Sequence, residues 1–175
     1  MKDFAHIPVM LNECIDGLKL QDGGIYFDGT VGGGGHSYEI LMGSSPNGRL
    51  IATDLDDDAI KAATQRLSPF GNRFKIYKSN YKNFEEVLKA ENIDFLDGAL
   101  LDFGVSSYQL DCEERGFSYM KPDAPLDMRM NSSAQLTAEM LLNEYRQNEI
   151  VKILKIYGEE KFASQIAANI VKART

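Results

Sequence analysis

The chain has 175 residues, of which 43% are hydrophobic and 26% are charged, and its formal net charge at pH 7 is −7. This length and composition are those of a globular protein with one domain, or one domain with an appendage, that can bury a core. The negative charge argues against a chain that binds nucleic acid over its whole surface, but it allows a local basic patch.

The cysteine content and the length of the apolar runs indicate in which cellular compartment the protein is expected. Cys14 and Cys112 have neither the spacing of a metal site nor the number needed for a disulfide framework, which favours a reducing environment. No apolar run approaches membrane-spanning length, and the first residues carry no signal or transit pattern. The sequence therefore predicts a soluble, cytoplasmic protein with no membrane contact and no metal.

The most informative stretch is 24–37. A short β-rich run ends at Asp28, four glycines follow at 32–35, and His36 then leads into an apolar helical pattern. Strand, glycine turn and helix form the first unit of a Rossmann-like sheet. Glycine lets a ligand approach the backbone, and the free N–H groups of the helix N-terminus attract an anion. A turn without any ligand is the alternative.

The spacing of these residues separates two cofactor classes. The dinucleotide fingerprint G-x-G-x-x-G would require its third glycine at Ser37, so that pattern is incomplete. Methyltransferases that use S-adenosylmethionine resemble D-x-G-x-G-x-G at the end of the first strand. The corresponding residues here are Asp28, Thr30, Gly32 and Gly34. Threonine thus replaces the first glycine, and the acid suits a ligand with an ammonium group, such as the methionine part of that cofactor.

Strand and helix patterns then alternate along the chain. Residues 10–18 have the apolar spacing of a short helix, and further strands are predicted at 48–54, 74–77 and 97–102. Asp56 to Asp58 suit the N-terminus of a helix through Leu67. The helix after the third strand is expected to bury Phe84, Val87 and Leu88, and the fourth strand is expected to be apolar on both faces. His6 is interpreted as a surface residue, with a place at the rim of a site as the alternative.

Three of the predicted strands end in an aspartate: Asp28, Asp54 and Asp102. Doubly wound sheets bind ligands at this carboxyl edge, so we expect the three acids near a ligand. Asp54 lies twenty residues beyond Gly34, where Rossmann-type sites place a carboxylate that accepts hydrogen bonds from a ribose diol. Tyr81 follows the third strand and is predicted to meet an adenine ring, with core packing as the alternative.

Residues 108–131 lose periodicity, and a loop of this length is usually functional when its composition is not that of a disordered segment. Arg115 and Arg129 could meet phosphates, and Phe117 and Tyr119 could stack on a base. A loop that packs on itself is the alternative.

Three helical patterns follow this loop, the first capped by Thr137 and the last with Phe162 among its apolar residues. We therefore predict an α/β fold. Residues 1–107 form a Rossmann-like, cofactor-binding sheet, and 108–175 form a loop and helical insertion.

Six segments together point to one family. They are HIPVMLNE (6–13), DGTVGGGGHS (28–37), DFGVSSYQLD (102–111), RGFSY (115–119), PLDMRM (125–130) and YGEEKFA (157–163). With these segments the chain resembles the bacterial 16S ribosomal RNA (cytosine-N4)-methyltransferase family over its whole length. The resemblance implies a class I methyltransferase fold and methylation of the exocyclic amine of a decoding-region cytidine. It also implies S-adenosyl-L-methionine as donor and 16S ribosomal RNA, within the small subunit, as partner.

The resemblance also implies which residues form the site. Cofactor contacts fall on Gly34, Gly35, His36, Asp54, Tyr81, Asp102 and Gln109. The amine of cytosine is a weak nucleophile, so an acceptor for its N–H would help as it attacks. Asp102 is the candidate catalytic acceptor, with a carbonyl in 103–106 as the alternative, and the base must leave its stack to reach it.

Members of the resembled family continue past Thr175, through the last strands of the sheet. We therefore expect this chain to end in or just after the helical insertion. With the edge of its fourth strand exposed, it should self-associate or need the missing half. Two alternatives to an active RNA methyltransferase remain. One is a nicotinamide-dependent oxidoreductase, and the other is a truncated piece that binds cofactor without turnover.

Overall fold

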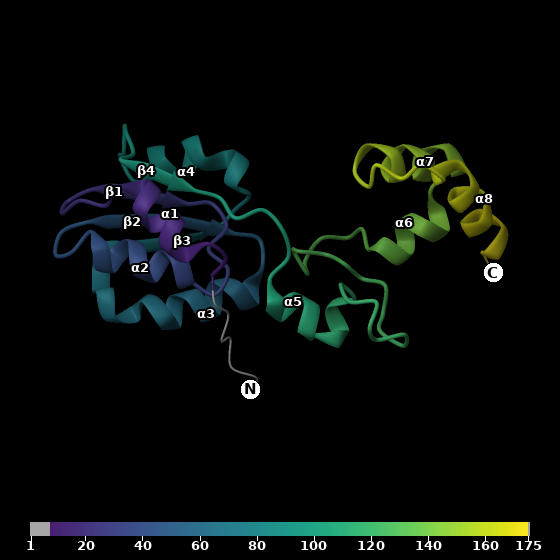
Figure 1. The fold of residues 1–175 in the computed structure, drawn as a ribbon, viewed down its shortest axis with the longest axis horizontal. Coiled ribbons are helices and arrows are strands. Elements are labelled where there is room, and N and C mark those ends of the chain that lie inside the picture. The colour runs from purple at the N-terminus through teal and green to yellow at the C-terminus, as the bar shows by residue number, and fades with distance from the viewer. Residues whose placement is uncertain (1–7, 175) are drawn as a thin grey trace. The chain divides into compact units, whose positions relative to one another are not determined.

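The computed structural model describes residues 8–174, so His6 lies outside the described residues (Figure 1). The chain forms two compact units. The first holds the residues up to Tyr108 together with Met130–Ser132, and the second holds Gln109–Arg129 and the residues from Ser133 onward. No helix in the described part of the chain is long and apolar enough to cross a membrane.

The first unit is built on a parallel sheet of four strands in the order β3-β2-β1-β4. The strands are β1 (Ile25–Asp28), β2 (Arg49–Asp54), β3 (Phe74–Lys78) and β4 (Gly98–Leu100). In the registers of the central strand, Ile25 lies opposite Arg49 and Tyr26 lies opposite Gly98. This order matches the start of a doubly wound, Rossmann-like sheet, which confirms the predicted fold class.

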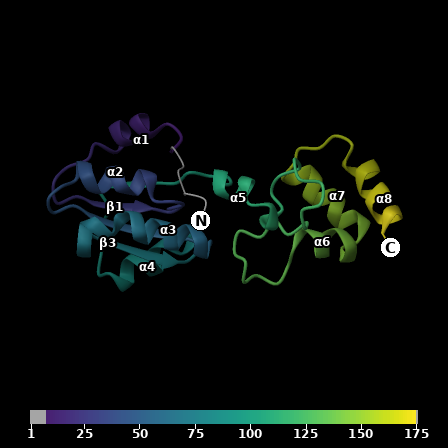
Figure 2. The same ribbon diagram turned by 90° about the horizontal axis from the view of Figure 1, so that it is seen from below.

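Helices cover both faces of this sheet, as the apolar strands require. α1 (Leu11–Leu18), α2 (Gly35–Gly43) and α3 (Asp57–Leu67) pack on one face, and α4 (Phe84–Ala90) packs on the other (Figures 1 and 2). The first face buries Tyr26, Val31, Ile40, Leu41, Leu50, Ala52, Ala63 and Leu67. The second buries Phe27, Ile51, Val87, Leu88 and Ile93. Short 3-10 turns, η1 (Ser68–Arg73) and η2 (Tyr81–Asn83), flank β3.

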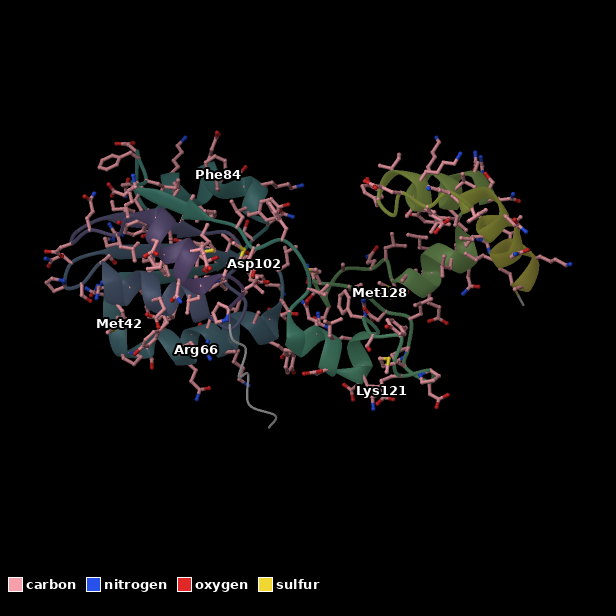
Figure 3. The ribbon with its side chains drawn as sticks, viewed as in Figure 1. Met42, Arg66, Phe84, Asp102, Lys121 and Met128 are labelled. Carbon is pink, nitrogen blue, oxygen red and sulfur yellow. The ribbon has the colours of Figure 1, made fainter. Side chains whose placement is uncertain are left out.

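Two details of the helices test the sequence predictions. The Asp56 carboxylate accepts a hydrogen bond from the Asp58 amide at 3.0 Å, so the predicted cap of α3 is confirmed. The expectation that Phe84 is buried is wrong, because Phe84 is exposed, as is Met42 of α2 (Figure 3). Phe84 opens α4, and its ring is tilted by 54° against that of Phe27, with the ring centroids 6.3 Å apart.

The fourth strand is shorter than predicted. It covers Gly98–Leu100, pairs with β1 alone in the described sheet, and leaves Ala99 and Leu101 exposed. The strand is apolar as expected, but in the described residues it lies at an edge of the sheet and not in the central position that this pattern suggests. Beyond Leu100 the backbone is held by a side chain, because the Asp102 amide donates to the Thr30 hydroxyl at 2.7 Å.

The second unit is helical. After α5 (Ser107–Asp111) and a 3-10 turn, η3 (Glu113–Arg115), an irregular segment leads to α6 (Ala138–Glu144), α7 (Gln147–Ile156) and α8 (Ala163–Ala173). The Thr137 hydroxyl accepts from the Met140 amide at 3.1 Å, which confirms the predicted cap. Phe162, one of the apolar residues of the predicted last helix, lies at the N-cap position of α8 and is 68% exposed.

Candidate functional site

The glycine turn connects β1 to α2 through two left-handed backbone positions. Gly32 has a φ of +50° and Gly34 has a φ of +75°, which L side chains rarely adopt. A Cβ on Gly34 would also lie 3.2 Å from the Cα of Ala63 in α3. Glycine at 32 and 34 is therefore needed for the turn and for close packing on α3, before any ligand is considered.

Asp54, the last residue of β2, holds this turn against the sheet. One carboxylate oxygen accepts from the Gly32 amide at 2.9 Å, and the other accepts from the amides of Leu55 and Asp56 at 2.7 and 3.0 Å. A carboxylate has about four acceptor positions. Three are used within the chain, so about one remains for a ligand hydroxyl, and not the two that a diol would use.

Asp28, the last residue of β1, lies inside the protein. It is 1% exposed, and its two oxygens accept from the Ser37 hydroxyl at 2.6 Å and the Thr30 amide at 3.1 Å. Burial raises the pKa of the Asp28 carboxyl, and these two hydrogen bonds oppose the rise. The interpretation that Asp28 meets a ligand ammonium is wrong, because its carboxylate joins the strand end to the first turn of α2.

Thr30 links the ends of β1 and β4. Its hydroxyl accepts from the Asp102 amide, which leaves the exposed Asp102 carboxylate at the carboxyl edge of the sheet (Figure 3). The adjacent Gly29 has no room for a side chain, since a Cβ there would lie 2.9 Å from atoms of both Leu101 and Tyr81. The sequence pattern marks Thr30 only as a departure from the glycine motif, because its contact with Asp102 depends on the position of β4.

A pocket of about 230 Å³ lies at the carboxyl ends of the four strands. The residues that line it are Gly29, Thr30, Asp54, Leu55, Ser79, Tyr81, Asp102, Phe103, Gly104 and Met130. Three of the predicted site residues, Asp54, Tyr81 and Asp102, are thus brought together. The rings of Tyr81 and Phe103 meet edge to face with centroids 5.5 Å apart, and Phe103 is 70% exposed.

The other predicted site residues do not line this pocket. Gly34 packs on α3, Gly35 lies against Pro8, and His36 is buried with a ring nitrogen 3.1 Å from the Val9 carbonyl. Gln109 belongs to the second unit and is buried there. Their role in cofactor binding stays a prediction.

Sequence reasoning missed several of the pocket residues. Ser79 follows β3 and donates its amide to the Asp54 carbonyl at 3.0 Å, a contact that continues the β2–β3 pairing. Met130 reaches the pocket from a segment far along the chain. The exit of a strand was a usable signal for Ser79, but no local pattern could have found Met130.

The long loop of the second unit packs on itself, the alternative that the sequence left open. The Arg129 guanidinium donates to both Asp127 oxygens, at 2.6 Å for the Nη2 contact, and to the Ala134 carbonyl at 2.6 Å. The hydrogen bonds with Arg129 lower the pKa of Asp127 and raise that of Arg129. Arg115 donates to the Arg129 carbonyl at 2.9 Å and lies over the Phe117 ring.

No group of three or more His, Cys, Asp or Glu side chains within residues 8–174 is placed to hold a metal ion. The charged groups of the pocket are the carboxylates of Asp54 and Asp102. The arrangement therefore offers hydrogen-bond acceptors, hydroxyls and exposed rings, a set suited to a neutral or cationic organic ligand with hydroxyl and amine groups.

Comparison with known proteins gives a consistent result. A family model described as the MraW methylase family matches residues 3–175. A protein of Agathobacter rectalis named ribosomal RNA small subunit methyltransferase H 2 is 51% identical over 172 residues, which is 98% of this chain and 55% of that protein. A protein of Symbiobacterium thermophilum named ribosomal RNA small subunit methyltransferase H is 50% identical over 171 residues, 98% of this chain and 54% of that protein.

The chain thus spans about half the length of the curated relatives it matches. A crystal structure of a candidate rRNA-methylase from Clostridium thermocellum aligns with 58% of this chain and 59% of that chain, with a TM-score of 0.45 and 23% sequence identity. That likeness is too remote to inform the site.

Proposed function

The chain belongs to the MraW methylase family, and from this membership we propose that it binds S-adenosyl-L-methionine and serves methyl transfer to 16S ribosomal RNA. The proposed target is the N4 amine of a cytidine in the decoding region. The observation that carries the proposal is the pocket at the carboxyl ends of β1 to β4, which holds Asp54, Tyr81 and Asp102.

The pocket residues fit the nucleoside part of this cofactor. The remaining acceptor position of Asp54 suits one ribose hydroxyl, and the exposed rings of Tyr81 and Phe103 offer faces for stacking on adenine. The volume of about 230 Å³ is below the roughly 300–1,000 Å³ typical of sites that enclose a complete ligand. These residues therefore account for a part of the cofactor.

When bound, the cofactor supplies an electrophilic methyl group on a sulfonium centre. The chain must then orient the amine, exclude water and accept a proton, since the amine lone pair is conjugated with the cytosine ring. Asp102 suits the last task because its amide is fixed by Thr30 and its carboxylate is exposed at the sheet edge. As the new N–C bond forms, the amine loses one proton, and the Asp102 carboxylate is the proposed acceptor. Holding the amine in line with the methyl group would supply the remaining rate acceleration.

Calorimetry with S-adenosylhomocysteine tests the first half of the proposal. We expect binding of S-adenosylhomocysteine and at most weak binding of NAD, because the dinucleotide fingerprint is incomplete. The reverse order would favour the oxidoreductase alternative.

Single-turnover transfer of a labelled methyl group to 16S ribosomal RNA and to small subunits tests the second half. Methyl transfer to the RNA would support the proposed methyltransferase activity. S-adenosylhomocysteine binding without any transfer would favour a chain that holds cofactor and does not turn over.

A further inference from the structure

Charge is distributed unevenly along this acidic chain. Residues 146–174, which contain α7 and α8, carry six basic and three acidic side chains, whereas the whole chain has a net charge of −7. Two of the three acids also serve the local backbone: Glu149 accepts from the Arg146 amide at 2.8 Å, and Glu160 accepts from the Phe162 amide at 2.7 Å. The α7–α8 segment is therefore one of two basic stretches in this acidic protein. The other, residues 61–82, has six basic and no acidic side chains, but Lys75 and Lys78 there pair with Glu91 and Asp57.

A hollow of about 690 Å³ lies along α7 in this segment. Six of its lining residues are Gln147, Asn148, Val151, Lys152, Lys155 and Ile156, and the seventh comes from α8. These six residues form two rows with a spacing of four, 147, 151 and 155 and then 148, 152 and 156, so they lie on one face of α7. Ile150, on the opposite face, is buried against the rest of the unit. We call this outward face the α7 hollow.

The α7 hollow combines groups that suit one class of partner. Neither Lys152 nor Lys155 has a carboxylate within ion-pair distance in the part of the chain that the structure describes. Side-chain amides at 147 and 148 can donate to and accept from base edges, and Val151 and Ile156 add apolar surface. The connection from α7 to α8, which lies between the lining residues Ile156 and Ser164 in sequence, adds two exposed rings, Tyr157 at 83% and Phe162 at 68%.

Unpaired lysines next to exposed aromatic rings are the features by which proteins bind single-stranded nucleic acid, through phosphate charge and base stacking. A partner protein could bind the apolar groups of the hollow, but such binding would not account for the unpaired lysines beside them. We propose that the α7 hollow and the adjoining rings of Tyr157 and Phe162 form a docking surface for a single-stranded segment of the substrate RNA. This inference rests on the proposed function and adds to it the surface that engages the RNA.

The test measures fluorescence anisotropy of a labelled single-stranded RNA of about 15 nucleotides, a length that covers one such site, over a series of salt concentrations. Lys152→Ala/Lys155→Ala should weaken binding about tenfold at low salt and reduce the slope of log affinity against log salt by about 1.4, since each single-strand phosphate contact contributes about 0.7. The matched control is Lys61→Ala/Lys172→Ala, which removes the same charge from exposed positions of α3 and α8 outside the hollow. The control should stay within about twofold of the wild type.

Ring substitutions separate RNA from a protein partner. Tyr157→Leu and Phe162→Leu keep apolar area but remove the stacking faces, so each should weaken RNA binding about five- to a hundredfold. Equal RNA affinity and salt slope in the lysine double variant and its control would overturn the proposal. A dimer that Ile156→Glu breaks, with RNA affinity unchanged, would also overturn it by assigning the surface to a second copy.

S-adenosylhomocysteine calorimetry on the same variants separates this inference from the proposed function. Unchanged cofactor binding in the lysine double variant, with RNA binding lost, supports the docking surface. Cofactor binding with no difference between the double variants leaves the proposed function standing and overturns the inference alone. Loss of all cofactor binding in the wild type would instead contradict the proposed function.

Discussion

Replacing Asp54 perturbs both the fold and the proposed cofactor pocket. In Asp54→Ala the amides of Gly32, Leu55 and Asp56 lose their acceptor. Hydrogen bonds to a charged group contribute about 1.5–3 kcal/mol each, but Asp54 is partly exposed and water can replace part of the two local contacts. We therefore expect a loss of about 2–4 kcal/mol in the free energy of unfolding.

Asp54→Asn distinguishes the local contacts from the one to the turn. Its remaining oxygen can still accept from Leu55 and Asp56, while its NH₂ group cannot accept from Gly32, so we expect about half of the loss seen in the alanine variant. The matched control is Asp57→Asn, an exposed residue whose ion pair with Lys78 should contribute at most about 0.5 kcal/mol.

Urea denaturation without ligand measures these differences, and calorimetry on the folded variants measures the pocket. Asp54→Ala should weaken S-adenosylhomocysteine by about 1–3 kcal/mol, because one hydroxyl loses its acceptor. An unfolding free energy for Asp54→Ala within about 0.5 kcal/mol of the wild type would refute the claim that this carboxylate holds the turn. Unchanged affinity would remove Asp54 from the proposed site.

Three further predictions concern Asp102, Asp28 and Arg129. Asp102→Asn should lower the single-turnover rate by about 10²–10⁴-fold with little change in unfolding free energy, because the Thr30 contact uses the backbone amide; an unchanged rate would remove Asp102 as proton acceptor. The raised folded-state pKa of Asp28 means that the neutral carboxyl contributes stability below the unfolded-state pKa and that this contribution is lost as pH rises through the folded-state pKa. Relative to Asp28→Asn, the wild type should therefore lose stability in urea titrations as pH rises above the unfolded-state pKa of about 4, and parallel profiles would contradict this. Arg129→Ala should destabilise the loop but leave RNA affinity and its salt slope unchanged, since its guanidinium is engaged by Asp127; a reduced slope would return Arg129 to the RNA surface.

Local signals predicted most of the sheet. The β-rich run before the four glycines, the acidic cap at Asp56 and the apolar strand ending at Asp54 each depend on neighbours in sequence, and each appears where expected. Parallel strands place their carboxyl ends on one edge, so the meeting of Asp54, Tyr81 and Asp102 also followed from the pattern.

What each side chain does there depends on contacts that spacing does not encode. Asp28 is buried because Ser37, in the first turn of α2, folds back onto it. Asp54 has most of its acceptor positions filled because the glycine turn lies over the end of β2. Met130 reaches the pocket from beyond the long loop. The apolar character of Phe162 suggested a position inside the last helix. α8 begins at Ala163, so Phe162 precedes the helix and is exposed.

The central claim is that the carboxyl ends of the four strands form the S-adenosyl-L-methionine site. Amide hydrogen exchange with and without S-adenosylhomocysteine tests it most directly, because protection reports which backbone segments a ligand stabilises. We predict protection concentrated at residues 29–32, 54–55, 79–81 and 102–104, with little change at the α7 hollow. Protection absent from these strand ends while the ligand binds would contradict the account.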